Sequence, residues 1–231
     1  MIRSIRELGR RLRAPFNRRW AFSRLEEYHA RPRSVEETVD WALTFGGGGY
    51  YNVTTIQVRS EILELARRVS GLEPRVILEI GTHRGGTLLI WSAIASRKVI
   101  SCDLRDFARG GDLLRSLPPR ESECEVTLLS GNSHAPDFRE RVAAALDGEK
   151  VDFLFIDGDH TREGVAQDYR DYRDFVRPGG LIAFHDIVAR QALPSNQVHD
   201  FWTTIAHTPG TDEIVGDPDQ TGFGIGVLRV A

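Results

Sequence analysis

The sequence has little cysteine, no long apolar run and no overall excess of basic residues. Its 231 residues include only two cysteines, Cys102 and Cys124, which form no CxxC pair. This argues against a disulfide framework and against a cysteine zinc site. No segment has the roughly 20 apolar residues of a membrane span or the apolar core of a secretory signal. The net charge of -3 gives no general attraction to nucleic acid. We therefore expect a cytoplasmic protein with no membrane span and no nucleic-acid partner.

Two glycine motifs of nucleotide-binding proteins are also absent. Neither G-x-G-x-x-G nor G-x-x-x-x-G-K-[ST] follows an apolar strand-like run, and this disfavours a nicotinamide-dependent oxidoreductase. The sequence has no internal repeat and no low-complexity tract beyond the glycines 46–49.

The N-terminus differs from the rest of the chain because it is strongly basic. Its first 33 residues hold ten arginines and three acids. The apolar residues at helical spacing are Ile2, Ile5, Leu8 and Leu12. The pattern predicts a helical arm that packs on the domain or on a second subunit, and contact with a membrane surface or an anionic ligand is the alternative. The arm is also the reason to expect a homo-oligomer.

A second helix is expected to begin at Ser34, because Glu37 stands at the third helical position of a capping box. Four consecutive glycines, Gly46–Gly49, predict a flexible loop. This loop is either a plain linker or a mobile lid, since Tyr50 and Tyr51 follow it directly. We accordingly divide the chain into a helical arm with a glycine-rich loop, residues 1–54, and a main domain, residues 55–231.

In the main domain, short apolar runs alternate with helical patterns. The runs expected to form strands are 75–80, 99–103, 126–129, 151–157, 180–185, 213–215 and 224–230. Helices are expected at 56–69, 88–94, 105–118, 135–147, 162–176 and 198–207. Continuously apolar strands between helices indicate a parallel sheet covered on both faces. We therefore predict an α/β fold with a doubly wound, mostly parallel seven-stranded sheet, in which the last two strands pair antiparallel at one edge.

In such a sheet, ligands bind at the carboxyl ends of strands where the strand order reverses. The first expected strand ends in the glycine turn Gly81–Gly86, where the backbone can approach a ligand closely. The second ends at Asp103, which either accepts hydrogen bonds from both hydroxyls of a ribose or caps a helix. The small polar residues Ser130–Ser133 follow the third strand and suit an adenine edge.

Three segments, VILEIGTHRGGT, ISCDL and VDFLFIDGDHTREGV…VRPGGLIAFHDI, make the chain similar to class I S-adenosylmethionine-dependent methyltransferases. It most resembles the group that contains macrolide-sugar O-methyltransferases and cephalosporin-hydroxylase-like proteins. The resemblance covers about residues 55–230 and implies the Rossmann-like methyltransferase fold with S-adenosylmethionine as cofactor. The implied cofactor-binding residues are Glu79, Gly81, Thr82, Gly85, Asp103, Ser133 and Asp157. Glu79 and Gly81 would contact the methionine end, Asp103 the ribose and Ser133 the adenine.

Five ionisable residues follow the fourth and fifth strands: Asp157, Asp159, His160, His185 and Asp186. Single members of the set can serve as caps or ion-pair partners, but acids gathered at one rim repel one another unless a cation offsets them. Similarity to metal-dependent O-methyltransferases implies a divalent metal, magnesium or manganese, on Asp157, His185 and Asp186, with His160 as the general base. The sugar methyltransferases usually have an acid where His185 stands, and imidazole suits manganese, iron or zinc better than magnesium.

The expected function is methyl transfer from S-adenosylmethionine to a hydroxyl of a small molecule, namely a sugar, a polyketide or a phenolic natural product. A non-catalytic S-adenosylmethionine-binding or scaffold protein of the same fold is the alternative, and a nicotinamide-dependent oxidoreductase is less favoured. The walls of the acceptor pocket are expected to come from the N-terminal helices and from residues 187–200.

Overall fold

A computed structural model describes residues 2–231, with the side chains of residues 12–231. The helices are α1 (Ile2–His29), α2 (Val35–Thr44), α3 (Arg59–Ser70), α4 (Gly86–Ile94), α5 (Gly111–Arg115), α6 (Pro136–Leu146), α7 (Arg162–Tyr172), η1 (Arg173–Phe175) and α8 (Val198–Ile205). The strands are β1 (Gly46–Gly48), β2 (Tyr51–Val53), β3 (Val76–Ile80), β4 (Lys98–Asp103), β5 (Glu125–Ser130), β6 (Val151–Ile156), β7 (Val176–His185), β8 (Thr211–Ile214) and β9 (Ile225–Arg229). Within the described residues, no helix is both long and apolar enough to cross a membrane.

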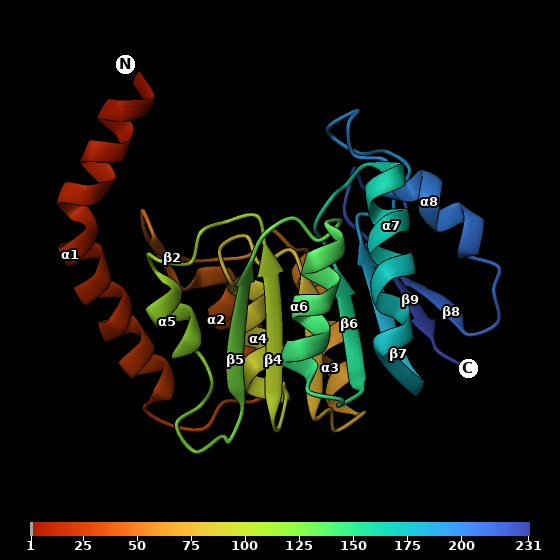
Figure 1. Cartoon of the computed structure of the whole chain (residues 1–231), viewed down its shortest axis with the longest axis horizontal. Helices are drawn as coiled ribbons and strands as arrows, with labels where there is room; N and C mark the ends of the chain where they lie inside the picture. The colour runs from red at the N-terminus through yellow and green to blue at the C-terminus, as the bar shows by residue number, and fades with distance from the viewer. Residues whose placement is uncertain (1) are drawn as a thin grey trace.

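The main sheet has seven strands in the order β5-β4-β3-β6-β7-β9-β8. The five strands from β5 to β7 are parallel, whereas β9 is antiparallel to β7 and β8 is antiparallel to β9 (Figure 1). The chain leaves β3 toward β4 on one side, and β6 lies on the other side, so the strand order reverses between β3 and β6. The predicted doubly wound α/β sheet with an antiparallel C-terminal edge is confirmed.

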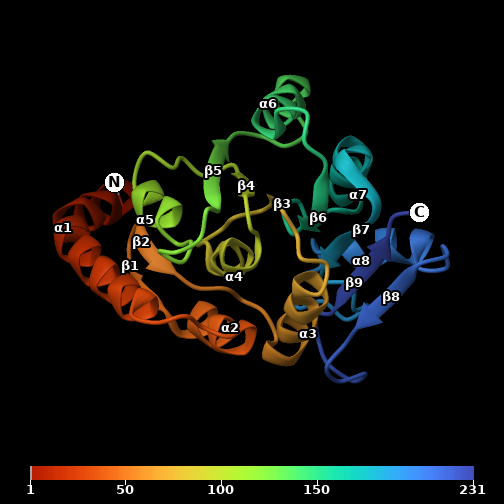
Figure 2. The same ribbon diagram turned by 90° about the horizontal axis from the view of Figure 1, so that it is seen from below.

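Helices cover both faces of the sheet, as Figure 2 shows. Helices α2, α3 and α4 pack on one face and α6 and α7 on the other, where α8 joins α7. Each face has its own apolar cluster. Every residue of β3 and β6 is buried, and Trp91 of α4 packs edge-on against Phe153 and Phe155. This double cover explains why the central strands are continuously apolar.

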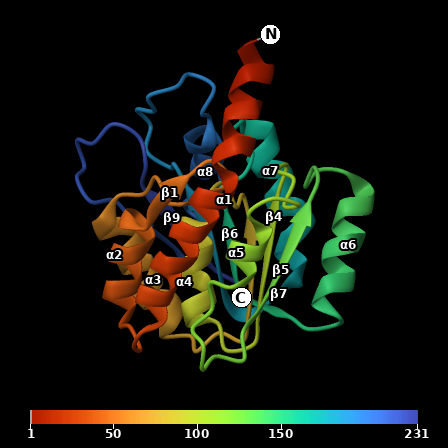
Figure 3. The same cartoon turned by 90° about the vertical axis from the view of Figure 1, so that its left-hand side faces the viewer.

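Helix α1 packs on the domain through its C-terminal half, where Ala21, Leu25 and Tyr28 are buried. Its N-terminal half extends beyond the domain (Figures 1 and 3). The apolar spacing expected at positions 2, 5 and 8 lies outside the described side chains. The start expected for α2 is confirmed, because Ser34 and Glu37 form both hydrogen bonds of the capping box.

The prediction of a flexible loop at the four glycines was wrong, because they belong to a β-hairpin. Strand β1 pairs antiparallel with β2, with Gly46 opposite Val53. At Gly47, where φ is +118°, a Cβ atom would lie 2.1 Å from the Tyr51 carbonyl oxygen, and at Gly48 it would lie 2.9 Å from Asn17 of α1. The glycines thus permit close packing of the hairpin rather than freedom of the loop.

Two helix predictions were too long. The helix expected at 105–118 is reduced to α5, because Asp103 accepts a hydrogen bond from the Arg105 amide and Asp106 accepts one from the Ala108 amide, which turns the chain before a helix can begin. The helix expected from Ile56 begins only at Arg59. Residues 54–58 have no regular secondary structure and cross the start of α4, where a Cβ atom at Gly86 would lie 2.4 Å from the backbone of Thr54 and Thr55.

Candidate active site

A cavity of about 840 Å³ opens at the carboxyl ends of the parallel strands. The predicted site residues that line it are Gly81, Thr82, Asp103, Ser133, Asp157, His160, His185 and Asp186, and Asp159 lines it as well. Its size is within the range of small-molecule and cofactor sites. The structure thus brings most of the residues expected for the cofactor, and all of those expected for the reaction, into one cavity.

The close approach of the backbone after β6 requires a glycine directly after β3. Gly81 has φ of +103°, and a Cβ atom there would lie 2.0 Å from the Asp157 carbonyl oxygen. The amide of Asp157 donates to the Ile80 carbonyl at 2.8 Å, so the backbones of β3 and β6 remain in contact beyond their last residues. Any side chain at this position would push the two strand ends apart.

Two of the predicted cofactor residues do not line the cavity. Glu79 points to the face covered by α4, where its side chain is fully buried and accepts a hydrogen bond from Ser101. Burial raises the pKa of Glu79 to about 7, against the effect of that hydrogen bond. Gly85 is the N-cap of α4 with φ of +80°, and a Cβ atom there would meet the Leu114 side chain at 2.5 Å.

Asp103 ends β4 at the cavity wall, and both of its carboxylate oxygens are oriented by backbone amides. Oδ2 accepts from the His83 amide at 2.6 Å and Oδ1 accepts from the Arg105 amide at 2.7 Å. Each carboxylate oxygen can accept more than one hydrogen bond. The carboxylate is therefore held in place by the protein and keeps capacity for a ligand that carries hydroxyl groups.

Helix α7 holds the loop that carries Ser133. The hydroxyl of Tyr172 donates to the Ser133 carbonyl at 2.6 Å, and the side-chain amide of Gln167 donates to the His134 carbonyl at 3.2 Å. The fully buried Asp168 lies 3.2 Å from the His134 ring. Burial raises the pKa of Asp168 to about 6. This wall of the cavity therefore depends on helix α7, which does not itself line the cavity.

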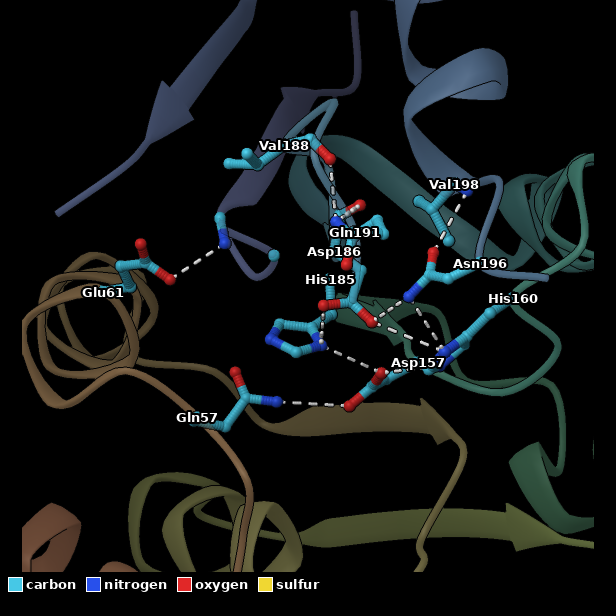
Figure 4. A network of polar contacts seen from close by, with 12 residues as sticks. Gln57, Glu61, Asp157, His160, His185, Asp186, Val188, Gln191, Asn196 and Val198 are labelled. Atoms are coloured by element: carbon cyan, nitrogen blue, oxygen red, sulfur yellow. Dashed lines mark hydrogen bonds and ion pairs between the residues drawn. The ribbon is translucent and has the colours of Figure 1, made fainter. Parts of the chain in front are cut away.

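Four ionisable side chains from the ends of β6 and β7 meet at the opposite wall (Figure 4). Asp157 Oδ1 lies 3.2 Å from His160 Nε2 and 3.2 Å from His185 Nδ1. Asp186 lies 3.4 Å from His160 Nδ1 through one oxygen and 3.4 Å from His185 Nδ1 through the other. Asp186 has φ of +67°, a conformation that costs a non-glycine residue free energy and is concentrated at functional sites.

The pKa values in this cluster reflect its alternation of acids and imidazoles. The hydrogen bond between His160 and Asp157 raises the pKa of His160 to about 9. Burial opposes ionisation of Asp157, but the charges of His185 and His160 outweigh it and hold the pKa of that carboxyl below its usual range. Burial also opposes protonation of His185, but the two carboxylates raise its pKa. Without a further cation, the imidazoles supply the positive charge of the cluster.

The donor set fits a divalent metal ion. One ligand atom from each of Asp157, His160 and Asp186 lies within 4.8 Å of the other two. His185, which was predicted as a ligand, directs Nδ1 toward both carboxylates, and its Nε2 is buried without a hydrogen-bond partner among the described residues. Two carboxylates with imidazole nitrogens are ligands that manganese, iron or zinc accept.

Sequence reasoning missed two residues of this cluster. The side-chain amide of Gln57 donates to Asp157 Oδ2 at 3.2 Å, while its Oε1 is buried without a hydrogen-bond partner among the described residues. The side-chain amide of Asn196 donates to Asp186 Oδ2 at 2.6 Å. Asn196 lies in the segment expected to line the acceptor pocket, whereas nothing in the sequence around Gln57 signals a site.

Residues 78–187 match the family described as methyltransferase domain. An uncharacterised protein of Acanthamoeba polyphaga mimivirus is 27% identical over 184 residues, which cover 73% of this chain and 79% of that protein. The family match covers the glycine turn after β3, Asp103, and the carboxyl ends of β6 and β7.

Several solved methyltransferases have a similar fold. The O-methyltransferase TomG of Streptomyces achromogenes, solved with S-adenosylmethionine, is 12% identical, with a TM-score of 0.58 over 87% of this chain and 92% of TomG. An O-methyltransferase of Bacillus cereus, solved with S-adenosylhomocysteine, is 19% identical, with a TM-score of 0.58 over 89% of this chain and 94% of that enzyme.

MycE, a methyltransferase of the mycinamycin biosynthetic pathway solved with magnesium, S-adenosylhomocysteine and mycinamycin VI, is 16% identical with a TM-score of 0.58. The alignment covers 86% of this chain but 55% of MycE, so the chain spans about half of that protein. Residues 78–187 are therefore similar to a methyltransferase domain, and the chain shares the fold of these solved methyltransferases.

Proposed function

We propose that this protein transfers the methyl group of S-adenosylmethionine to a hydroxyl of a small-molecule acceptor. The observation that carries the proposal is the single cavity in which Gly81 and Asp103 face the cluster of Asp157, His160 and Asp186. A cofactor and an acceptor bound in one cavity can be held in line for direct transfer. Since the sulfonium donor is already activated, orientation provides much of the rate acceleration.

The cofactor half of the cavity is built from the ends of β3, β4 and β5. In our proposal, Asp103 accepts hydrogen bonds from the ribose hydroxyls and Ser133 lies beside the adenine. Gly81 and Thr82 allow the methionine end to approach the backbone. Glu79 supports this wall indirectly, because it is buried between the sheet and α4 and accepts a hydrogen bond from Ser101. Gly85 permits the turn into α4.

The acceptor half contains the proposed metal ligands Asp157, His185 and Asp186, and a ring nitrogen of His160 lies within 4.8 Å of ligand oxygens of Asp157 and Asp186. A divalent ion bound there would hold the acceptor oxygen and lower its pKa. His160 is proposed as the base that takes the acceptor proton, and therefore not as a ligand of the metal. While Asp157 and Asp186 keep His160 protonated, it cannot accept that proton, so we expect its proton to be lost when the carboxylates bind another cation.

The acceptor is proposed to be a natural product, on the analogy of TomG, which is involved in tomaymycin synthesis, and MycE, which belongs to the mycinamycin pathway. A homo-oligomer and a cytoplasmic location are also proposals. The cytoplasmic location is supported by Cys102 and Cys124, which are buried and form no disulfide, as expected in a reducing compartment.

Methyl transfer to a panel of sugars, polyketides and phenols tests the proposal, with product detected by mass. Activity should fall after chelation and return with manganese. His160→Ala should lower kcat by about 10²- to 10⁴-fold with little change in S-adenosylhomocysteine affinity. His199→Ala, a histidine on α8 outside the cavity lining, is the matched control. The non-catalytic alternative would be favoured if the protein binds the cofactor but methylates no acceptor, and if neither added metal nor His160→Ala changes that binding.

A further inference from the structure

Helix α1 exposes a row of apolar side chains that begins on the part that extends beyond the domain and continues along the part that packs on the domain. Leu12 is 75% exposed, Phe16 is 73% exposed and Trp20 is 38% exposed. They are spaced four residues apart, so they lie along one face of the helix. The opposite face buries Ala21 and Leu25 against the domain.

The other large apolar side chains that are exposed in the described part of the chain are Ile56, Leu104 and Leu193, and all three line the mouth of the cavity. Figure 1 shows the free half of α1 rising past the same end of the molecule at which β4 ends and the loop between β7 and α8 projects. Exposed apolar groups are therefore gathered at one end of the protein, as at interaction surfaces.

The same segment of α1 is basic. Residues 12–25 contain four arginines and no acid. Arg18 pairs with Asp112 and Arg24 stacks on Trp41, so these two face the domain. Arg13 and Arg19 are exposed and have no ionic partner among the described residues. A partner for this face must therefore offer both negative charge and apolar surface.

An anionic lipid surface offers both, whereas a second copy of α1 would bring arginines against arginines. A helix with an apolar row flanked by basic residues is the usual form of a segment that lies in the bilayer interface. We propose that the exposed face of α1, with the cavity mouth beside it, docks on the surface of an anionic lipid bilayer. Docking in this way places the opening of the cavity at the membrane surface.

Sedimentation of the full chain with vesicles tests the proposal without cofactor or acceptor. The protein should bind vesicles of phosphatidylcholine and phosphatidylglycerol in equal parts, bind pure phosphatidylcholine vesicles more weakly, and lose affinity as salt is added. The double substitution Leu12→Asp with Phe16→Asp should weaken binding more than about tenfold. Thr203→Asp on α8 with His207→Asp in the turn that follows it makes the same formal charge change far from α1 and should bind like the wild type.

A second variant protects the test against a folding defect. Arg13→Glu with Arg19→Glu leaves the apolar row intact and should weaken binding to the anionic vesicles by about tenfold, with circular dichroism unchanged. Wild-type protein that sediments with neither kind of vesicle would overturn the proposal. So would a wild-type dimer that becomes monomeric in the Leu12→Asp and Phe16→Asp variant without any vesicle binding, because the face would then belong to a second copy of the chain.

Discussion

The carboxyl group of Glu79 lies between β3 and α4 with a pKa of about 7, whereas its ordinary value is 4.5. The folded protein therefore keeps a proton that the unfolded chain has already lost between pH 4.5 and 7. The free energy of unfolding should fall as pH rises through that window, by up to about 3 kcal/mol from this group. Glu79→Gln, which mimics the neutral form, should remove this part of the pH dependence. Urea unfolding of both proteins at about pH 5 and about pH 8 measures this pH dependence. If the free energy of unfolding changes equally with pH in the wild type and in Glu79→Gln, the raised pKa does not belong to Glu79.

A second prediction at the scale of a residue concerns Asp103. Replacing it by asparagine keeps the shape but removes the charge and one acceptor oxygen. Affinity for S-adenosylhomocysteine should fall by about ten- to hundredfold, since hydrogen bonds to a charged group are the stronger ones. Asp106→Asn, at an exposed acid outside this cavity, is the control in a calorimetric titration. An unchanged affinity in Asp103→Asn would show that the cofactor ribose does not bind there.

At the scale of the elements, the wall of the cavity around Phe223 depends on one buried carboxylate of α3. Glu61 accepts hydrogen bonds from the amides of Gly216 and Gly224 at 2.9 and 3.0 Å and from the Gln220 side chain at 2.8 Å. Glu61→Gln turns an amide donor toward these donors and should lower the free energy of unfolding by about 2–4 kcal/mol.

Glu64→Gln, on the same helix, is the matched control for Glu61. It removes only the half-exposed pair with Arg68, which should cost less than about 0.5 kcal/mol. Urea unfolding compares the two variants. If both variants lose a similarly small free energy of unfolding, the segment from Gly216 to Gly224 does not depend on Glu61.

Helix α7 should influence cofactor affinity although it does not line the cavity. Tyr172→Phe removes the hydrogen bond to the Ser133 carbonyl and should weaken S-adenosylhomocysteine binding by about fivefold, the equivalent of one hydrogen bond. Tyr169→Phe is the control, because Tyr169 contacts Phe184, Phe201 and Arg173 through its ring. If both variants bind S-adenosylhomocysteine equally well, the loop that carries Ser133 does not need the hydrogen bond from Tyr172.

The elements that the sequence predicted well are those that follow one rule along their whole length. The continuous apolar runs of β3 and β6 predict buried strands between two layers of helices. Ser34 and Glu37 predict a capping box, which marks the start of a helix. The hairpin at Gly46–Gly48 escaped prediction because its stability comes from close packing on α1, which no local pattern reveals. The short α5 differs from its prediction because side chains of Asp103 and Asp106 compete with the helix for backbone amides.

At the scale of the whole molecule, the meeting of Asp103 with the acids and histidines after β6 and β7 could be predicted, because parallel strands bring their carboxyl ends to one edge. The distances among Asp157, His160 and Asp186 could not, since they depend on loop conformations such as the positive φ of Asp186. Gln57 was beyond prediction for a similar reason, as it reaches Asp157 only because residues 54–58 cross the start of α4. The proposed division of the chain at residue 54 accordingly falls beside a segment that lines the cavity.

The central claim is that this cavity binds S-adenosylmethionine, and calorimetric titration of the full chain with S-adenosylhomocysteine tests it most directly. The account predicts one site per chain with Kd of about 10 µM or tighter, and loss of most of that affinity in Asp103→Asn. Added manganese is not required for this binding, because the proposed metal ligands lie in the acceptor half of the cavity. A folded protein that binds no S-adenosylhomocysteine, with or without manganese, would contradict the account.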